Sequence, residues 1–236
     1  CHAPDGLGNC DIYSAKRSSD GSWKNIQNLG EAINSDQWDS HPSINFSGDT
    51  LYFASGRKGG FGGTDIYFST KNKKGKWTTA QNLGPKINTL GVEVSPFTHP
   101  KYNLLYFSSN NQLLNFGNFD IYKSYKINKQ WTEPRNIGPL VNGIGDEFYF
   151  TIDSDSRQLF YARSEEKDVE NLDIFSFPLP MEAQPLAFTN FSGVLIDSTT
   201  GKPLKGMVSI IDLTSGIEVA PKFIREDGSF DFNLIE

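Results

Sequence analysis

Three carboxylates recur along the chain at one fixed interval. The step from Asp39 to Glu93 is the same as the step from Glu93 to Glu147, and we call it the repeat interval. Carboxylate oxygens are the ligands that hard cations such as Ca²⁺ prefer, so a ring of the three at one mouth of a channel could hold a metal ion. Alternatively, each accepts hydrogen bonds from backbone N–H groups of the adjoining loops and fixes one repeat onto the next. We favour this structural alternative, because one residue type repeated through an array is usually architectural, and we expect no cofactor.

The same interval governs the segments that must position these carboxylates. Each unit contains a strand led by the acidic residue, a Leu-Tyr-Phe strand such as residues 51–55, an Asp-Ile-Tyr strand such as residues 65–70, and a tryptophan strand. The alternating pattern excludes helical repeats. Four short antiparallel strands per unit are typical of a β-propeller blade, because one such sheet must stack on neighbours to bury both faces. The sequence therefore predicts an all-β fold, a β-propeller of four-stranded blades.

Two further sets of repeated side chains are expected to be structural. The Asp-Ile-Tyr aspartates follow turns, where a carboxylate bonds the backbone of its own hairpin. The repeated tryptophans are expected to pack between blades. Trp38 breaks the interval and is the better candidate for a surface contact. The two repeated sets are Asp11, Asp65, Asp120 and Asp173, and Trp23, Trp77 and Trp131.

The repeats also predict how the chain is divided. Residues 1–30 hold the last two strands of a blade, 39–83 and 93–137 hold two whole blades, and 147–177 hold three strands of another. We expect propeller blades over residues 1–178, with at least one further blade upstream because fewer than four blades do not close. A Pro-rich linker is expected at 179–189. Residues 190–236, which lack tryptophan, are expected to begin a small β-sandwich that is incomplete at its C-terminus.

The repeated phrases resemble a known family. Residues 59–67 (GGFGGTDIY), 75–77 (GKW), 82–84 (NLG) and 51–55 (LYFAS) resemble the WD40-like, TolB-type propeller repeats of OmpA-family envelope proteins of Bacteroidota. Residues 191–204 and 227–232 are similar to a carboxypeptidase regulatory-like domain. This resemblance implies a periplasmic lipoprotein associated with the outer membrane, with an OmpA-like peptidoglycan-binding domain outside this chain. It also implies a link to the type IX secretion system or a similar assembly.

The two cysteines are candidates for a disulfide. The repeat register places Cys1 at the end of a Leu-Tyr-Phe strand and Cys10 at the start of the next strand, opposite each other across a hairpin. An exported protein would oxidise such a pair. The alternative is that Cys1 is a lipid-modified N-terminal residue. We favour the disulfide, because Cys1 already has a place inside a blade.

Several functions are disfavoured by composition. The net charge of -6 and the missing basic stripe argue against a nucleic-acid partner. The chain contains no run of eighteen apolar residues, so its sequence does not predict a transmembrane segment. The three histidines have no evident Ser or Cys partner and no nucleophile elbow is found, so we do not expect an enzyme.

These observations favour a non-enzymatic periplasmic scaffold that binds other envelope proteins through loops. The candidate contact residues are Trp38, Lys58, Phe61, Phe116, Glu165, Glu166 and Asp168. The alternative is a propeller that binds a glycan or a peptide, or an enzyme whose catalytic residues lie outside this chain.

Overall fold

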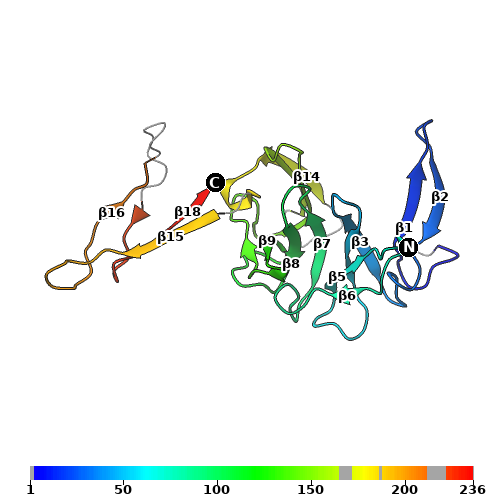
Figure 1. Ribbon diagram of the computed structural model, residues 1–236, viewed down its shortest axis with the longest axis horizontal. Coiled ribbons are helices and arrows are strands. Elements are labelled where there is room, and N and C mark those ends of the chain that lie inside the picture. The colour runs from blue at the N-terminus through cyan, green and yellow to red at the C-terminus, as the bar shows by residue number, and fades with distance from the viewer. Residues whose placement is uncertain (1–2, 165–171, 186–187, 212–221, 236) are drawn as a thin grey trace. The chain divides into compact units, whose positions relative to one another are not determined.

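The computed structural model describes residues 3–164, 172–185, 188–211 and 222–235. Two compact units divide the chain, Cys1–Pro185 and Leu186–Glu236. Both are built from antiparallel strands, and the only helical element among the described residues is the single turn η1 (Met181–Ala183). The all-β prediction is therefore confirmed (Figure 1).

The first unit is a row of propeller blades with the predicted strand order. Blade 1 pairs two strands, blades 2 and 3 contain the full set, and blade 4 pairs three strands. The fourth strand of blades 2 and 3 is shorter than expected, because only short pieces pair with the preceding strand. The strands are β1 (Tyr13–Arg17) and β2 (Trp23–Asn28); β3 (Asp39–Ile44), β4 (Thr50–Ser55), β5 (Asp65–Thr70) and β6 (Gln81–Asn82); β7 (Glu93–Thr98), β8 (Leu104–Ser109), β9 (Asp120–Ile127), β10 (Gln130–Trp131) and β11 (Arg135–Asn136); and β12 (Asp146–Ile152), β13 (Gln158–Ser164) and β14 (Asp173–Pro178).

The antiparallel order gives every blade two distinct ends. At one end, here called the Asp end, the first strands begin with Asp39, Glu93 and Asp146, and the glycine-rich loops connect the second strand to the third. At the other, the hairpin end, tight turns at residues 45–49, 99–103 and 153–157 connect the first strand to the second. All the described residues that we predicted for partner contacts lie at the Asp end.

Apolar side chains from successive blades meet in three buried clusters. Blade 3 is covered on both faces, so the whole of its strand β8 is buried. Trp77 packs on the cluster between blades 1 and 2, and Trp131 packs on the one between blades 2 and 3, where its ring meets Tyr52 edge-on. Trp23 differs, because 65% of its surface is exposed. Packing between blades is thus confirmed for two of the three tryptophans.

Residues 179–185 belong to the propeller unit, whereas we expected a linker over 179–189. Leu179 and Ala183 are buried in the cluster between blades 3 and 4. The Tyr106 hydroxyl donates a hydrogen bond to the Ala183 carbonyl, and Lys123 Nζ donates to the Gln184 carbonyl at 2.9 Å. The segment is therefore a structural part of the last blade.

The repeat interval explains why this segment packs there. In blade 3, Trp131 packs on the ring of Tyr52. One repeat interval further along the chain, Trp131 corresponds to residue 185 and Tyr52 corresponds to Tyr106. Residues 179–185 thus cover in blade 4 the position that a tryptophan strand covers in blade 3.

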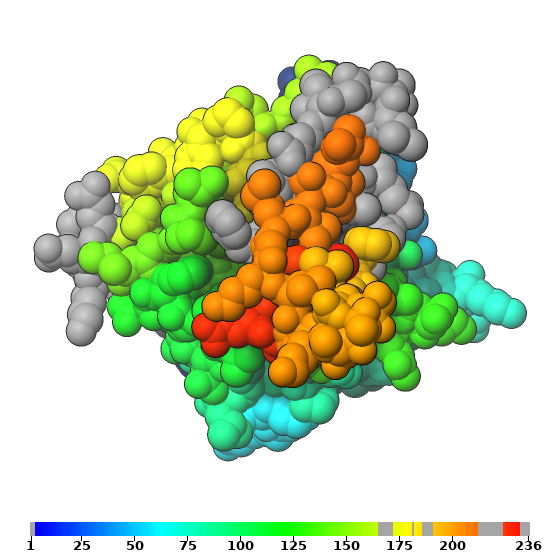
Figure 2. Space-filling view, turned by 90° about the vertical axis from the view of Figure 1, so that its left-hand side faces the viewer, coloured from blue at the N-terminus to red at the C-terminus, as the bar shows by residue number. Residues whose placement is uncertain are grey.

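The second unit contains two small antiparallel pairs. The strand β15 (Phe188–Val194) pairs with β18 (Ser229–Ile235) along its whole length, and β16 (Met207–Val208) pairs with β17 (Lys222–Phe223). In the space-filling view β18 (red) lies beside the golden β15 and the orange residues that follow it (Figure 2). The β-sandwich assignment stays a prediction. No helix in the described ranges is long and apolar enough to cross a membrane.

Candidate functional site

The repeated aspartates hold the Asp end together. Asp65 accepts hydrogen bonds from the backbone N–H groups of Phe61 and Gly62 at 2.6 and 3.1 Å, and from Asn82 Nδ2 at 2.7 Å. Asn82 Oδ1 in turn accepts from Asn88 Nδ2 at 2.8 Å. Asp11 and Asp120 make the same bonds in blades 1 and 3, so this network is architectural, as the sequence predicted for these two and Asp65.

The carboxylates at the start of the first strands are buried and bound to nearby groups. Asp39 Oδ2 accepts from the backbone and hydroxyl of Ser35, both at 2.6 Å, and Oδ1 pairs with Arg57 at 2.7 Å. Glu93 accepts from the backbone and hydroxyl of Thr89 and from Ser109 Oγ at 2.7 Å. These are bonds to the adjoining loops, as the structural alternative requires. No cluster of three or more His, Cys, Asp or Glu side chains suited to a metal is present in the part of the chain that the structure describes.

Glu147 differs from its two repeat partners. Arg163 Nε lies 3.1 Å from its Oε1, yet within the described residues neither atom makes a hydrogen bond of normal geometry. Burial raises the pKa of Glu147 to about 7, although the backbone N–H of Gly143 and the charge of Arg163 lower it. Burial also raises the pKa of Glu93. The three positions therefore share a place in the fold but not an electrostatic environment.

A second set of repeat-related residues lies two positions further along the same strands. His41, Ser95 and Tyr149 follow one another at the repeat interval, and all three have left-handed backbones with φ of 51°, 50° and 55°. The pairing register of each first strand shifts at this point, which marks a β-bulge. Non-glycine residues rarely adopt such φ values, and strained positions cluster at functional sites.

The three bulges bring their residues to one place. The backbone N–H of Ser95 donates to His41 Nδ1 at 3.2 Å, and the Tyr149 hydroxyl lies 3.2 Å from His41 Nε2. Since Nδ1 accepts, Nε2 carries the hydrogen and donates to the Tyr149 oxygen. Burial lowers the pKa of His41 to about 4, which keeps the imidazole neutral at pH 7. Tyr149 is 51% exposed, so its O–H is left to donate to a ligand.

The cluster is not arranged for nucleophilic catalysis. Ser95 Oγ lies 3.4 Å from His41 Nδ1, a proximity that we did not expect from the sequence. However, the backbone N–H of Ser95 already occupies the Nδ1 lone pair, and an imidazole whose pKa is about 4 is a weak base. Ser95 itself is buried. The arrangement suits recognition better than proton transfer.

Aromatic rings extend the cluster on both sides. Trp38, half-buried just before β3, meets the His41 ring edge-on at 5.0 Å between centroids, and Tyr149 meets it at 5.1 Å. Beyond Tyr149, the ring of Phe148 lies at 6.2 Å and that of Phe119 follows at 4.9 Å from Phe148. We call Trp38, His41, Ser95, Phe148 and Tyr149 the inner-strand cluster, since four of the five lie on the first strands of blades 2, 3 and 4.

The predicted contact residues are distributed around the Asp end. Lys58 is exposed, and Phe61 and Phe116 are 43% and 41% exposed at equivalent positions of their loops. Their backbone N–H groups bond Asp65 and Asp120, so each ring is held on an ordered turn. Glu165, Glu166 and Asp168 lie outside the described residues, as does Cys1. Cys10 is buried and forms a β-bridge with Trp38, and its pairing with Cys1 stays a prediction.

The sequence predicts a surface contact at Trp38 but gives no such signal for His41, Ser95 or Tyr149 taken singly. The available signal was the repeat interval itself, since stepping along the chain by that interval from His41 leads directly to both.

No protein-family model matches the sequence, and no match was found among curated proteins. A TolB-type protein of Agrobacterium tumefaciens has a similar structure, with 10% identity and a TM-score of 0.44, over 95% of this chain and 70% of that one. TolB of Acinetobacter baumannii is similar at 12% identity and a TM-score of 0.45, over 89% of this chain and 47% of that one.

A third similar structure is a puromycin-hydrolysing peptidase of Mycobacterium tuberculosis, with 13% identity and a TM-score of 0.41. It is matched over 95% of this chain and 37% of its own length. This chain thus spans less than half of the second and third of these proteins. At such identities the likeness is one of fold alone.

Proposed function

We propose that this propeller is a non-enzymatic protein-interaction module whose partner segment contacts the inner-strand cluster. One observation carries the proposal: three repeat-equivalent positions share a strained backbone but carry His41, Ser95 and Tyr149. The architectural positions around them repeat the same residue, as Asp and Asn do at the Asp end. A purely structural bulge would be served best by glycine in every blade. Different side chains held at the cost of strain, and directed to one place, favour recognition.

The chemistry of the cluster indicates what such a partner presents. Tyr149 offers a hydroxyl donor, and Trp38 offers an aromatic ring that contacts the neutral His41. The nearby carboxylates of Asp39 and Glu93 are fully buried and bound to protein groups. A segment with a carbonyl acceptor next to an apolar or aromatic side chain suits this combination.

The wider setting of the proposal comes from the repeat resemblance. We place the protein in the periplasm, associated with the outer membrane, as a scaffold of a complex such as the type IX secretion system. Peptidoglycan would be bound by an OmpA-like domain outside this chain. The order of a TolB-type propeller followed by a carboxypeptidase regulatory-like segment supports this setting.

A photo-crosslinking experiment in envelope preparations tests the interaction. A crosslinking amino acid replaces Tyr149 in one variant and Ile174, which is exposed on the third strand of blade 4 outside the cluster, in the control. The expected result is a discrete adduct with one envelope protein from position 149 only, which Trp38→Ala weakens. Adducts that are equally frequent from both positions, or that survive Trp38→Ala unchanged, would contradict the proposal.

The row of aromatic rings also favours a second candidate, a glycan ligand, because sugar rings stack on aromatic faces. Titration with soluble peptidoglycan fragments, followed through the indole N–H signal of Trp38, separates the two. A saturable shift that Tyr149→Phe abolishes would favour the glycan over the protein partner.

A further inference from the structure

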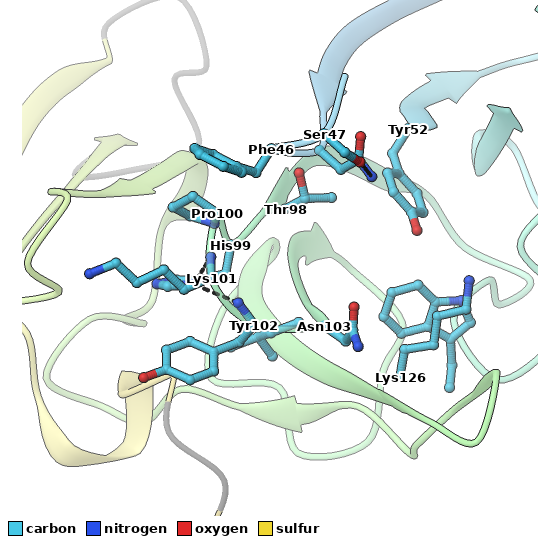
Figure 3. Close-up of a pocket in the computed structure, with 13 residues that line it drawn as sticks. Phe46, Ser47, Tyr52, Thr98, His99, Pro100, Lys101, Tyr102, Asn103 and Lys126 are labelled. Atoms are coloured by element: carbon cyan, nitrogen blue, oxygen red, sulfur yellow. Dashed lines mark hydrogen bonds between the residues drawn. The ribbon is translucent and has the colours of Figure 1, made fainter. Parts of the chain in front are cut away.

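A groove lies between blades 2 and 3 at the hairpin end, which is the far end of β3 from Trp38. It has a volume of about 270 Å³ and is formed by the turns at 45–49 and 99–103 together with β9 and β10 (Figure 3). Sites that bury drug-sized ligands are roughly 300–1,000 Å³, so this groove is suited to one or two side chains of a peptide. It is separate from the inner-strand cluster.

Both turns that form the groove are held by side-chain caps. Asn45 Oδ1 accepts the backbone N–H groups of Asp49 and Thr50 at 3.1 and 3.0 Å. His99 Nδ1 accepts those of Lys101 and Tyr102 at 3.1 and 3.2 Å. The groove is therefore largely preformed, which lowers the entropic cost of binding.

The two capped turns present aromatic side chains to solvent. Phe46 is 85% exposed on the first turn, and Tyr102 is 38% exposed on the second. Tyr52 and Trp131 form the base on one side. Their arrangement offers a place for an apolar side chain of a partner.

The charged side chains that line the groove are both positive, and the nearby carboxylate of Asp49 is bonded to Asn45 and Thr50 within its own turn. Two lysines line it and no carboxylate does, although the chain as a whole carries a net charge of -6. Lys126 Nζ lies 5.3 Å from the Trp131 ring centroid and 5.7 Å from that of Phe68. Neither Lys101 nor Lys126 forms an ion pair with any residue that the structure describes. In Figure 3 the two ammonium groups lie at opposite ends of the row of side chains.

We infer that this groove docks an acidic peptide segment that carries an apolar side chain between its carboxylates. The apolar side chain would lie among Phe46, Tyr52 and Trp131, and the carboxylates would pair with Lys101 and Lys126. A partly buried ammonium next to aromatic rings gains more from an ion pair than a fully exposed one, because water screens the charges less. Together with the inner-strand cluster, the groove would give the blades a docking site at each end.

The test titrates the full chain with a short acetylated peptide of glutamates around one phenylalanine, followed by backbone amide NMR. The expected result is a saturable set of shifts confined to residues 45–49, 99–103 and 126–131, which weakens as salt is added. The peptide with glutamine in place of glutamate should bind about tenfold more weakly, because it loses both ion pairs. Equal binding of the two peptides would overturn the inference.

Variants of the two lysines test whether the peptide binds in this groove. Lys126→Met keeps the apolar stem over the rings and Lys101→Gln changes an exposed side chain, and each should weaken binding severalfold. Lys16→Gln removes the same charge from an exposed position on blade 1 and should leave binding unchanged. Thermal unfolding checks that the variants are folded. Unaltered affinity in both groove variants would refute the docking site, as would a concentration-dependent dimer that the peptide cannot displace.

Discussion

The side chain of Asn88 bonds both backbone groups of Ile66, with Oδ1 accepting from the N–H at 2.8 Å and Nδ2 donating to the carbonyl at 2.9 Å. Both residues are buried, and Asn34 and Asn142 make the same pair of bonds to Ile12 and Ile121. The loop that leads into one blade is thereby fastened to the third strand of the preceding blade.

Removing this amide should destabilise the propeller. Asn88→Ala leaves the buried N–H and carbonyl of Ile66 without their partner, which costs about 2–4 kcal/mol. The measurement is the urea midpoint of the variant against that of the native chain. Asn111→Ala, at an exposed loop position, is the control and should change little. Equal midpoints for the two variants would contradict the role of Asn88.

Gly62 should tolerate no side chain. A Cβ there would lie 2.1 Å from the carbonyl oxygen of Gly91, in the loop that leads into the next blade. The Gly91 oxygen belongs to the backbone and cannot rotate away, so Gly62→Ala must move one blade against the other. We expect the free energy of unfolding to fall by about 2–4 kcal/mol. At Gly56 the nearest atom would lie 3.8 Å away. Gly56→Ala should therefore be nearly neutral, and comparable losses in both variants would count against the explanation.

The imidazole of His41 should stay neutral well below pH 6.5. Its pKa is lowered to about 4 by burial, so the unfolded chain binds a proton that the folded chain does not. Protonation of His41 therefore does not reduce the free energy of unfolding above pH 6.5. Below that pH the unfolded chain gains the proton first, so the free energy of unfolding decreases as the pH falls toward 4. NMR of the ring carbons across this range gives the pKa directly. A midpoint near 6.5 would contradict the buried, Ser95-bonded state.

Glu147 should act in the opposite sense. Its pKa is raised from 4.5 to about 7, so the folded chain holds the proton more tightly than the unfolded chain. Stability from this group is present below pH 4.5 and is lost as the pH rises through 7. Glu147→Gln should therefore stabilise the protein above pH 7 by on the order of 1–3 kcal/mol, with the gain disappearing near pH 4.

Glu93→Gln is the matched variant, and it should lose stability. The oxygens of Glu93 accept from Thr89 and Ser109, donors that an amide nitrogen would oppose. Urea unfolding of both variants at pH 5 and pH 8 decides the matter. A gain for both at pH 8 would show that burial alone, and not the bonding of each carboxylate, sets their energetics.

The propeller unit should need residues 179–185. A chain ended after residue 185 keeps Ala183 over Tyr106, whereas a chain ended after residue 178 exposes that buried face. We expect the first to unfold at the temperature of the full chain and the second at a clearly lower one. Identical melting temperatures would return the segment to the linker that the sequence suggested.

The repeats made the fold predictable, because the interval marks the same strands in every blade. The bounds of β3, β4 and β5 follow from comparing Asp39, Leu51 and Asp65 with their equivalents in the next blade. The role of residues 179–185 could not be predicted in this way, since Ala183 and Pro185 resemble no tryptophan strand. Ala183 is buried in the same apolar cluster as the Tyr106 ring, a contact that only the three-dimensional arrangement reveals.

The inner-strand cluster was hidden for a different reason. A repeat search finds positions that carry the same residue, and His41, Ser95 and Tyr149 have in common only a backbone angle. Such an angle has no signature in sequence when the residue is not glycine. The groove at the hairpin end was equally hidden, because Phe46 and Lys126 come from different blades and meet only when the blades stack.

The segment 179–185 also determines how the propeller would respond to tension. A pull on the chain beyond residue 185 meets the buried contacts of Ala183 and the bonds of Gln184 before it reaches the edge of β14. The load would pass first into Tyr106 and Lys123 of blade 3, and so into the interior of the propeller unit. Such a pull would therefore have to break these buried contacts before it reached the hydrogen bonds between β13 and β14.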